Sequence, residues 1–302
     1  MALHKNLSAL LGDYELIGIL MKLLRYGAVG CEKLGVLDDA GMIRDLSAYC
    51  ADLTEDTVVQ LPEILQQIEI NTLPTVSGSV RIGACIRRPG KLMCVGYNTR
   101  LHNIQMGAKE IDCDDLVVFL KPSSAISGPY DPICYGRHMK KLDWEAELGV
   151  MIGKRGKYIE KQDAMDYVFG YLCVHDLSER YWQFETADKQ FTKGKGMDGC
   201  APIGPYLVEK KDVPDPHNLR VQLWVNEILR QDFNTKDYLR DVPSVVSYLS
   251  QFFTLYPGDI ISMGSAPGNA KSWGDDFYLK VGDQVRFTIE GLGVQEQRVI
   301  TE

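Results

Sequence analysis

The chain has 302 residues, of which 45% are hydrophobic and 25% are charged, a composition typical of soluble globular proteins. Its formal net charge of −8 argues against nucleic acid or an anionic membrane surface as the main partner, and no apolar run is long enough to predict a membrane span. The eight cysteines form no CxxC pair and no secretion signal opens the chain, so we expect a reduced, cytoplasmic protein.

The N-terminal part of the chain predicts a small α/β domain. We expect residues 1–20 to be an extension that precedes an older start at Met21, and the domain itself to cover residues 21–88. Its predicted elements are strands at 22–27 and 34–47, the second folded at the turn 38–41, and one or two short helices within 54–70.

Residues 89–302 predict a larger domain in which apolar strand-like runs recur between turn signals. The predicted strands are 91–97, 115–121, 146–153, 167–177, 205–208, 219–226, 259–264 and 284–292. Helical patterns are few, at roughly 161–167 and 241–253. The expected fold is therefore a β-rich α+β protein, with the small domain attached to a mixed-sheet domain.

The stretch LDWEAELGV, residues 142–150, predicts a strand with an unusual polar face. Asp143, Glu145 and Glu147 alternate with apolar residues, so they share one side of that strand. Two ionised carboxylates that close repel each other unless a cation or solvent separates them. One interpretation is a half-exposed strand with its polar side in water, and the other is a bound cation.

Two later stretches carry further polar groups. In residues 171–183 an apolar strand ends at Asp176, which either caps a following helix or adds a carboxylate to a site. In residues 191–208 three glycines surround Lys195, so this segment is either a flexible turn or a backbone that approaches a ligand. The spacing of a phosphate-binding loop is absent.

Glu145, Glu147 and Asp176 together offer three hard oxygen donors at the ends of two neighbouring strands. Such a set suits Mg²⁺, Mn²⁺ or Ca²⁺ and leaves positions open for water and substrate. The five histidines show no zinc-type spacing.

From about Met21 to its end, the chain resembles the fumarylacetoacetate hydrolase family. Its N-terminal segment looks most like the bacterial branch often labelled ureidoglycolate lyase or diketo-deoxy-sugar-acid hydrolase. The resemblance rests on six ordered motifs: MCVGYNTRLH (93–102), FLKPSSAISGPYDPI (119–133), DWEAELGVMIG (143–153), GYLCVHDLSER (170–180), TKGKGMDGCAPIGPYLV (192–208) and LYPGDIISMG (255–264).

The resemblance implies a roll of curled mixed β-sheets, a homodimer, and one divalent cation per subunit, with Mg²⁺ expected first. It implies a small oxo-acid as substrate and cleavage of a β-diketo acid or acylpyruvate into a pyruvate-like product and a second acid. The implied roles are metal binding by Glu145, Glu147 and Asp176, oxyanion or enolate stabilisation by Lys195, substrate binding by Arg180, Gln183, Ser265 and Lys121, and water activation by His102 from a lid over 98–113.

Four departures from the family pattern affect that reaction. Gln105 stands where the family usually has a glutamate three residues after the lid histidine, and a neutral amide can orient the imidazole but cannot stabilise its protonated form. Thr99 replaces a tyrosine, the segment 194–199 reads GKGMDG and lacks a threonine hydroxyl, and the late turn keeps a hydroxyl only at Ser265.

Three functions therefore stay open. The first is a metal-dependent carbon–carbon bond hydrolase. The second is a decarboxylase, isomerase or lyase that works through a pyruvate-type enolate and needs no activated water. The third is a ligand-binding homologue without activity, since a shared fold does not fix function.

Overall fold

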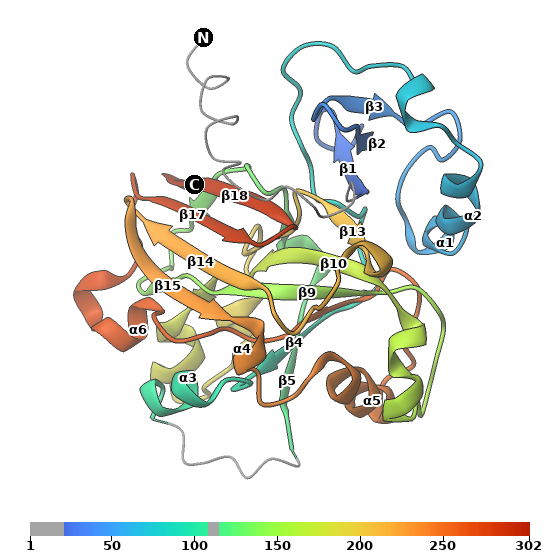
Figure 1. Ribbon diagram of the computed structural model, residues 1–302. Coiled ribbons are helices and arrows are strands. Elements are labelled where there is room, and N and C mark those ends of the chain that lie inside the picture. The colour runs from blue at the N-terminus through green and yellow to red at the C-terminus, as the bar shows by residue number, and fades with distance from the viewer. Residues whose placement is uncertain (1–20, 108–114) are drawn as a thin grey trace.

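The computed structural model describes residues 21–107 and 115–302, and these residues build two stacked β-sheets (Figure 1). The extension predicted for 1–20 lies outside the described residues, as does part of the lid predicted for 98–113. No helix in the described ranges is long and apolar enough to cross a membrane.

The larger sheet carries the candidate site. Within the described residues it has nine strands, in the order β3-β2-β1-β13-β10-β9-β16-β4-β5. Their bounds are Lys22–Tyr26 (β1), Lys33–Leu37 (β2), Ile43–Asp45 (β3), Leu92–Gly96 (β4), Val117–Lys121 (β5), Ala146–Ile152 (β9), Val168–His175 (β10), Leu207–Glu209 (β13) and Ile260–Ser262 (β16).

The second sheet has five strands in the described part of the chain, in the order β15-β14-β17-β18-β7. Its strands are Ile133–Tyr135 (β7), Arg220–Val225 (β14), Ile228–Asn234 (β15), Gln284–Ile289 (β17) and Gly293–Thr301 (β18). Two short pairs complete the β-structure, Leu142–Asp143 (β8) with Ser178–Glu179 (β11), and Ile126–Ser127 (β6) with Ala201–Pro202 (β12).

The helices are short and lie around the sheets (Figure 1). They are Glu55–Val58 (α1), Leu61–Gln66 (α2), Arg100–Gln105 (α3), Phe191–Lys195 (α4), Val242–Phe252 (α5) and Ala270–Trp273 (α6). The helix predicted at 241–253 is confirmed as α5, whose N-cap Asp241 accepts the Ser244 backbone N–H at 2.9 Å. The segment 161–167 forms a 3₁₀-helix instead of an α-helix.

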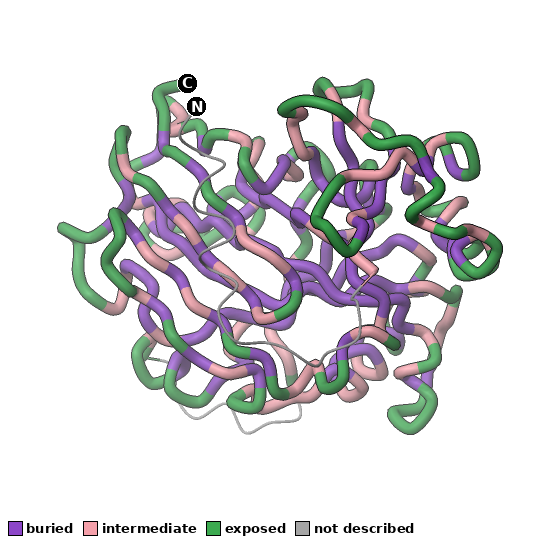
Figure 2. Tube along the Cα trace, turned by 45° about the horizontal axis from the view of Figure 1, so that its top comes forward, coloured by how far each residue is buried: buried purple, intermediate pink, exposed green. Residues whose placement is uncertain are grey.

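Both faces of the larger sheet are covered, so its central strands are buried throughout (Figure 2). On one face Ala146, Leu148 and Val150 of β9 join the core between the two sheets. On the other face Met151 and Leu172 belong to a second core, which also contains apolar residues of the N-terminal strands. The half-exposed interpretation of residues 142–150 is therefore wrong, because the polar face is covered as well.

The expected β-rich fold is confirmed, and the N-terminal strands extend the large sheet. Strand β1 pairs with β13, with Leu23 opposite Leu207, and buried residues on both sides of this junction form one core. The division into 21–88 and 89–302 stays a prediction.

Candidate metal centre

Three carboxylates converge at one end of the β9–β10 pair. Glu147 lies on β9, Glu145 immediately precedes that strand, and Asp176 immediately follows β10. The antiparallel register sets Val174 opposite Glu147, and the Asp176 backbone N–H donates to the Glu145 carbonyl at 2.9 Å. One carboxylate oxygen of each residue lies within 4.8 Å of the others, and all three residues are buried. The predicted trio is thus brought together.

Two lysines hold this acidic cluster together. Lys195 Nζ donates to Glu145 Oε2 and to Asp176 Oδ2, both at 2.6 Å, and Lys121 Nζ donates to Asp176 Oδ1 at 2.6 Å. Burial alone would lower the pKa of Lys195, but Asp176 and Glu145 raise it above its ordinary value. Asp176 is therefore no helix cap, and the segment carrying Lys195 is part of the site.

Arg180 connects the cluster to a fourth buried carboxylate. Its Nε donates to Asp143 at 2.8 Å, one terminal nitrogen reaches Glu145, and the other donates to Gln183 Oε1 at 2.8 Å. Burial raises the pKa of Asp143, which also accepts the Ala270 backbone N–H and so anchors α6. Gln183 lies in a single π-helical turn, a distortion that often marks functional sites.

Glu147 is the one member of the trio that makes no ion pair with a described residue. Its Oε2 accepts hydrogen bonds from Ser262 Oγ at 2.6 Å and the Gly264 backbone N–H at 3.0 Å. Burial, followed by the charges of Asp176 and Glu145, raises its pKa well above the ordinary value. By contrast, Arg180 and Lys195 outweigh burial and hold the pKa of Glu145 well below its ordinary value.

The surrounding charges fit a divalent cation. In the described structure four buried carboxylates face three buried cations, namely Asp143, Glu145, Glu147 and Asp176 against Lys121, Arg180 and Lys195. With all four carboxylates ionised, one negative charge is left over, and it falls on Glu147, whose hydrogen-bond donors are neutral. Three oxygen ligands around that position match the donors that Mg²⁺ and Mn²⁺ take.

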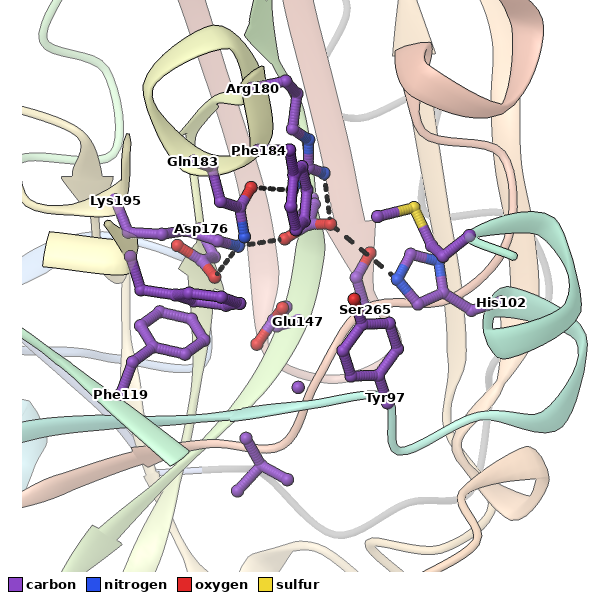
Figure 3. Close-up of a pocket in the computed structure, with 15 residues that line it drawn as sticks. Tyr97, His102, Phe119, Glu147, Asp176, Arg180, Gln183, Phe184, Lys195 and Ser265 are labelled. Atoms are coloured by element: carbon purple, nitrogen blue, oxygen red, sulfur yellow. Dashed lines mark hydrogen bonds and ion pairs between the residues drawn. The ribbon is translucent and has the colours of Figure 1, made fainter. Parts of the chain in front are cut away.

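The site opens into a cavity lined by charged and polar side chains on one part of its wall and by aromatic and apolar residues on the rest (Figure 3). The three carboxylates, Arg180, Gln183, Lys195, His102 and Ser265 line it together with Val95, Gly96, Tyr97, Met106, Phe119, Phe184 and Phe191. The predicted substrate ligands Arg180, Gln183 and Ser265 therefore do face the cavity.

His102 approaches the cavity from α3. Its Nε2 lies 4.0 Å from Glu145 Oε1, and the side chain is buried. Burial lowers its pKa to about 4 against the opposing effect of Glu145, so the imidazole is neutral near pH 7 and can accept a proton. Its Nδ1 has no hydrogen-bond partner in the described structure.

Two predicted site residues lie elsewhere. Gln105 is exposed, and its Oε1 accepts the Gly268 backbone N–H at 3.1 Å, so it does not orient the ring of His102 in this conformation. Lys121 does not line the cavity, because its ammonium is buried behind Asp176 and also donates to the Leu177 carbonyl at 3.0 Å. Its predicted substrate contact stays a prediction, and in this structure its partner is the carboxylate of Asp176.

Two further residues, Gln231 and Thr99, support the position of Ser265. Gln231 is buried on β15; its Nε2 donates to Ser265 Oγ at 3.0 Å and its Oε1 accepts the Ala146 backbone N–H at 3.0 Å. Thr99 Oγ1 donates to the Ser265 carbonyl at 3.1 Å. No sequence motif points to Gln231. Ser262, by contrast, could have been identified as a site residue, because it directly precedes the turn that contains Ser265.

Comparison with known proteins gives a consistent result. The sequence profile of the fumarylacetoacetate hydrolase C-terminal domain matches residues 91–300. A protein of Burkholderia orbicola (strain MC0-3), named provisionally as a hydrolase, is 45% identical over 280 residues, which cover 92% of this chain and 98% of that protein.

Two solved structures are similar over almost the whole chain. Maleylpyruvate hydrolase from Sphingobium sp. SYK-6, in complex with manganese(II) and pyruvate, has a TM-score of 0.78 and 28% identity, covering 93% of this chain and 99% of its own. A probable 2-hydroxyhepta-2,4-diene-1,7-dioate isomerase from Mycobacterium abscessus has a TM-score of 0.79 and 28% identity, covering 94% and 99%.

Proposed function

This chain belongs to the fumarylacetoacetate hydrolase family, and on that premise we propose that it is a divalent-metal-dependent hydrolase that cleaves a carbon–carbon bond in an acylpyruvate-type oxo acid. The observation that carries this proposal is the buried trio Glu145, Glu147 and Asp176, with Lys195 between two of its members. The similar hydrolase with manganese and pyruvate supports both the ion class and the substrate head group.

The metal centre and its neighbours divide the work between them. Glu145, Glu147 and Asp176 would hold the cation, which supplies Lewis-acid polarisation of the oxo and carboxylate oxygens of the substrate. Mg²⁺ is our first expectation, and Mn²⁺ is the ion in the similar hydrolase.

Lys195 and His102 would handle charge and protons. Both side chains line the same cavity. The ammonium of Lys195 donates a hydrogen bond to the substrate oxygen that gains negative charge as the carbon–carbon bond breaks. The neutral imidazole of His102 takes a proton from the attacking water at Nε2, the nitrogen on the side of Glu145.

The proposal is tested with purified, Mg²⁺-loaded protein and a panel of acylpyruvates. We expect loss of the enol absorption band together with release of pyruvate and a second acid. Lys195→Met should lower the rate by at least about 100-fold. Lys193→Met is the matched control, because that lysine lies on the same helix and is paired with the exposed Asp188. Protein that binds the cation and turns over no acylpyruvate contradicts the proposal.

A decarboxylase, isomerase or lyase that needs no activated water is the second candidate. What favours it is the surroundings of His102, where Nδ1 has no hydrogen-bond partner among the described residues and Gln105 bonds elsewhere, so no described group supports the imidazole through Nδ1. The similar isomerase supports the same candidate. Carbon dioxide release from oxaloacetate, or enol–keto conversion without acid production, would establish it.

The third candidate, a binding protein without turnover, predicts cation and pyruvate binding with no reaction in any of these assays. Gln105→Glu separates the first two candidates further, since a sharp rise in hydrolysis would show that the natural residue serves another step. The homodimer and the cytoplasmic location stay predictions.

A further inference from the structure

Tyr97 lines the cavity but has no part in the metal centre or in the mechanism proposed above. It directly follows β4, in the segment that leads to α3, and its side chain is half-buried. Figure 3 shows its ring on the same side of the cavity as His102 and Ser265, with Lys195 and Asp176 on the opposite side. The ring centroids of Tyr97 and His102 are 6.4 Å apart. Tyr97 therefore lies beside the proposed proton acceptor.

The backbone keeps Tyr97 in this place in an unfavourable conformation. Its φ is 59°, in the left-handed region, where a bulky side chain is rare. The next residue, Asn98, fixes the turn, because its side chain donates to the Met263 carbonyl at 2.9 Å and accepts the Arg240 backbone N–H at 2.9 Å. The Tyr97 carbonyl accepts from Asn103 Nδ2 at 3.0 Å. Strain that the surrounding structure maintains is typical of functional sites, so the direction of this side chain points to a role.

The hydroxyl of Tyr97 is available to a ligand. It makes no hydrogen bond with any residue in the ranges 21–107 and 115–302, and the side chain borders the cavity. Burial raises the pKa of this phenol, and Glu145 opposes the lowering effect of Arg180 and Lys195, so the phenol is protonated near pH 7. A neutral phenol can donate a hydrogen bond but does not act as a base.

Hydrolysis of an acylpyruvate develops negative charge on two different oxygens. The acyl oxygen gains charge when water adds to the acyl carbon, and the oxo oxygen of the pyruvate part gains charge when the carbon–carbon bond breaks. The proposed function gives Lys195 to the oxo oxygen and gives the water to His102. The attacked carbon, and with it the acyl oxygen, therefore lies on the side of His102. On that side the Ser265 hydroxyl already donates to the Ala266 carbonyl at 3.3 Å, whereas the Tyr97 hydroxyl is not engaged.

We propose that Tyr97 is a catalytic residue whose hydroxyl donates a hydrogen bond to the acyl oxygen of the substrate as water adds to the acyl carbon. Such a donor stabilises the charge where it develops and is therefore worth more in the transition state than in the ground state. This inference rests on the proposed function and adds to it a donor for the second oxygen.

The proposed step conserves atoms and electrons. Water gives one proton to His102, its oxygen bonds to the acyl carbon, and the electron pair of the carbonyl double bond moves to the acyl oxygen, which accepts from Tyr97. When that pair re-forms the double bond, the carbon–carbon bond breaks and its electrons pass to the enolate of pyruvate. The enolate takes up the proton from His102, so the products are pyruvate and a second acid.

Steady-state kinetics of the Mg²⁺-loaded protein with acetylpyruvate tests this role. Tyr97→Phe removes one oxygen atom, and we expect kcat and kcat/KM to fall together by about 10–100-fold while KM changes little. Tyr130→Phe is the matched control and should keep the native kcat, because that phenol is exposed and does not line the cavity. Thermal melting shows whether each variant is folded.

Calorimetry gives a second readout that needs no turnover. The ligand is the phosphinate analogue of acetylpyruvate, in which a tetrahedral phosphorus with an anionic oxygen replaces the acyl carbon. Tyr97→Phe should weaken binding of this analogue about tenfold, the effect of one hydrogen bond to a charged group. Its affinity for pyruvate should match that of the native protein, because pyruvate has no acyl group.

The outcomes separate the two proposals. If the native protein hydrolyses acetylpyruvate and Tyr97→Phe keeps the native kcat, the role of Tyr97 is overturned and the proposed function stands. An equal loss of affinity for the phosphinate and for pyruvate also overturns that role, since it would place the phenol at the oxo-acid end. If the native protein binds Mg²⁺ and turns over no acylpyruvate, the proposed function fails and the role of Tyr97 fails with it.

Discussion

Glu145 and Glu147 are two residues apart, yet the structure predicts opposite effects when each is changed to glutamine. Glu145 contacts Arg180 and Lys195, so Glu145→Gln leaves two buried cations without a full partner. Breaking a buried ion pair from one side costs about 3–5 kcal/mol of stability. Glu147 accepts hydrogen bonds only from neutral donors, and Asp176 and Glu145 repel it more strongly than Lys195 attracts it, so Glu147→Gln relieves repulsion. The amide oxygen of the new glutamine can keep both hydrogen bonds.

The same two variants should lose the cation. Even changes outside the ligand shell weaken metal affinity about 10–100-fold, so loss of a charged ligand should weaken it at least as much. At a free cation concentration of about 100 Kd the native protein gains roughly 2.7 kcal/mol, and a 100-fold weaker Kd reduces that gain to roughly 0.4 kcal/mol.

The assay is urea unfolding with and without Mg²⁺, in the presence of a chelator for the metal-free state. Metal-free Glu147→Gln should match or exceed the stability of the native chain and gain almost nothing from Mg²⁺, whereas metal-free Glu145→Gln should be destabilised. Equal destabilisation of the metal-free protein by both variants would refute the charge assignment, as would full Mg²⁺ stabilisation of Glu147→Gln.

Three further variants extend these predictions. His102→Asn should lower hydrolysis about 10²–10⁴-fold and leave Mg²⁺ affinity unchanged in calorimetry, since the imidazole is a proton acceptor in the proposal; unchanged hydrolysis contradicts that role. Lys121→Met should lower the free energy of unfolding by about 3–5 kcal/mol, because it removes one of the two buried lysines that pair with Asp176, and an effect below about 1 kcal/mol in urea unfolding would argue against the pairing. A hydrogen bond from the Met42 backbone and the ion pair with Arg44 lower the pKa of Asp38. The contribution of Asp38 to stability is therefore present above the unfolded-state pKa of 3.8 and is lost as pH falls through the lower folded-state pKa. Asp38→Asn should flatten the acid limb of a stability–pH curve below pH 3.8, and an unchanged slope excludes this contribution.

The carboxylate trio could be predicted from the sequence because strand periodicity is local. Alternation alone set Glu145 and Glu147 on one side of β9, and the apolar run before Asp176 set that residue at the end of β10. Whether a face of the β9–β10 pair is exposed to water depends on which other parts of the chain pack against that face. The second core includes Leu23 and Leu34, which lie more than a hundred positions earlier in the chain, so the periodicity held no information about them.

Two strands escaped prediction for a shared physical reason. In β15 and β18 some of the inward positions are occupied by glutamine, at Gln231, Gln295 and Gln297. Gln295 Nε2 donates to three backbone carbonyls, so this amide is satisfied inside the core. Buried amides hide the hydrophobic period on which strand prediction relies.

The side-chain partners of Lys121 and Gln105 could not be predicted for a different reason. A motif shows that a residue is near a site, but its side-chain partner is set by tertiary packing. Lys121 donates to Asp176 from outside the cavity lining. Gln105 accepts a hydrogen bond from the Gly268 backbone, 163 residues away in the chain. Neither contact is encoded in local spacing.

Anomalous diffraction from a crystal soaked in Mn²⁺ tests the central claim most directly. We predict one strong peak about 2.0–2.6 Å from carboxylate oxygens of Glu145, Glu147 and Asp176, with the Lys195 ammonium displaced from its position between two of them. A map with no peak there, and with Lys195 still bridging Glu145 and Asp176, would contradict the account.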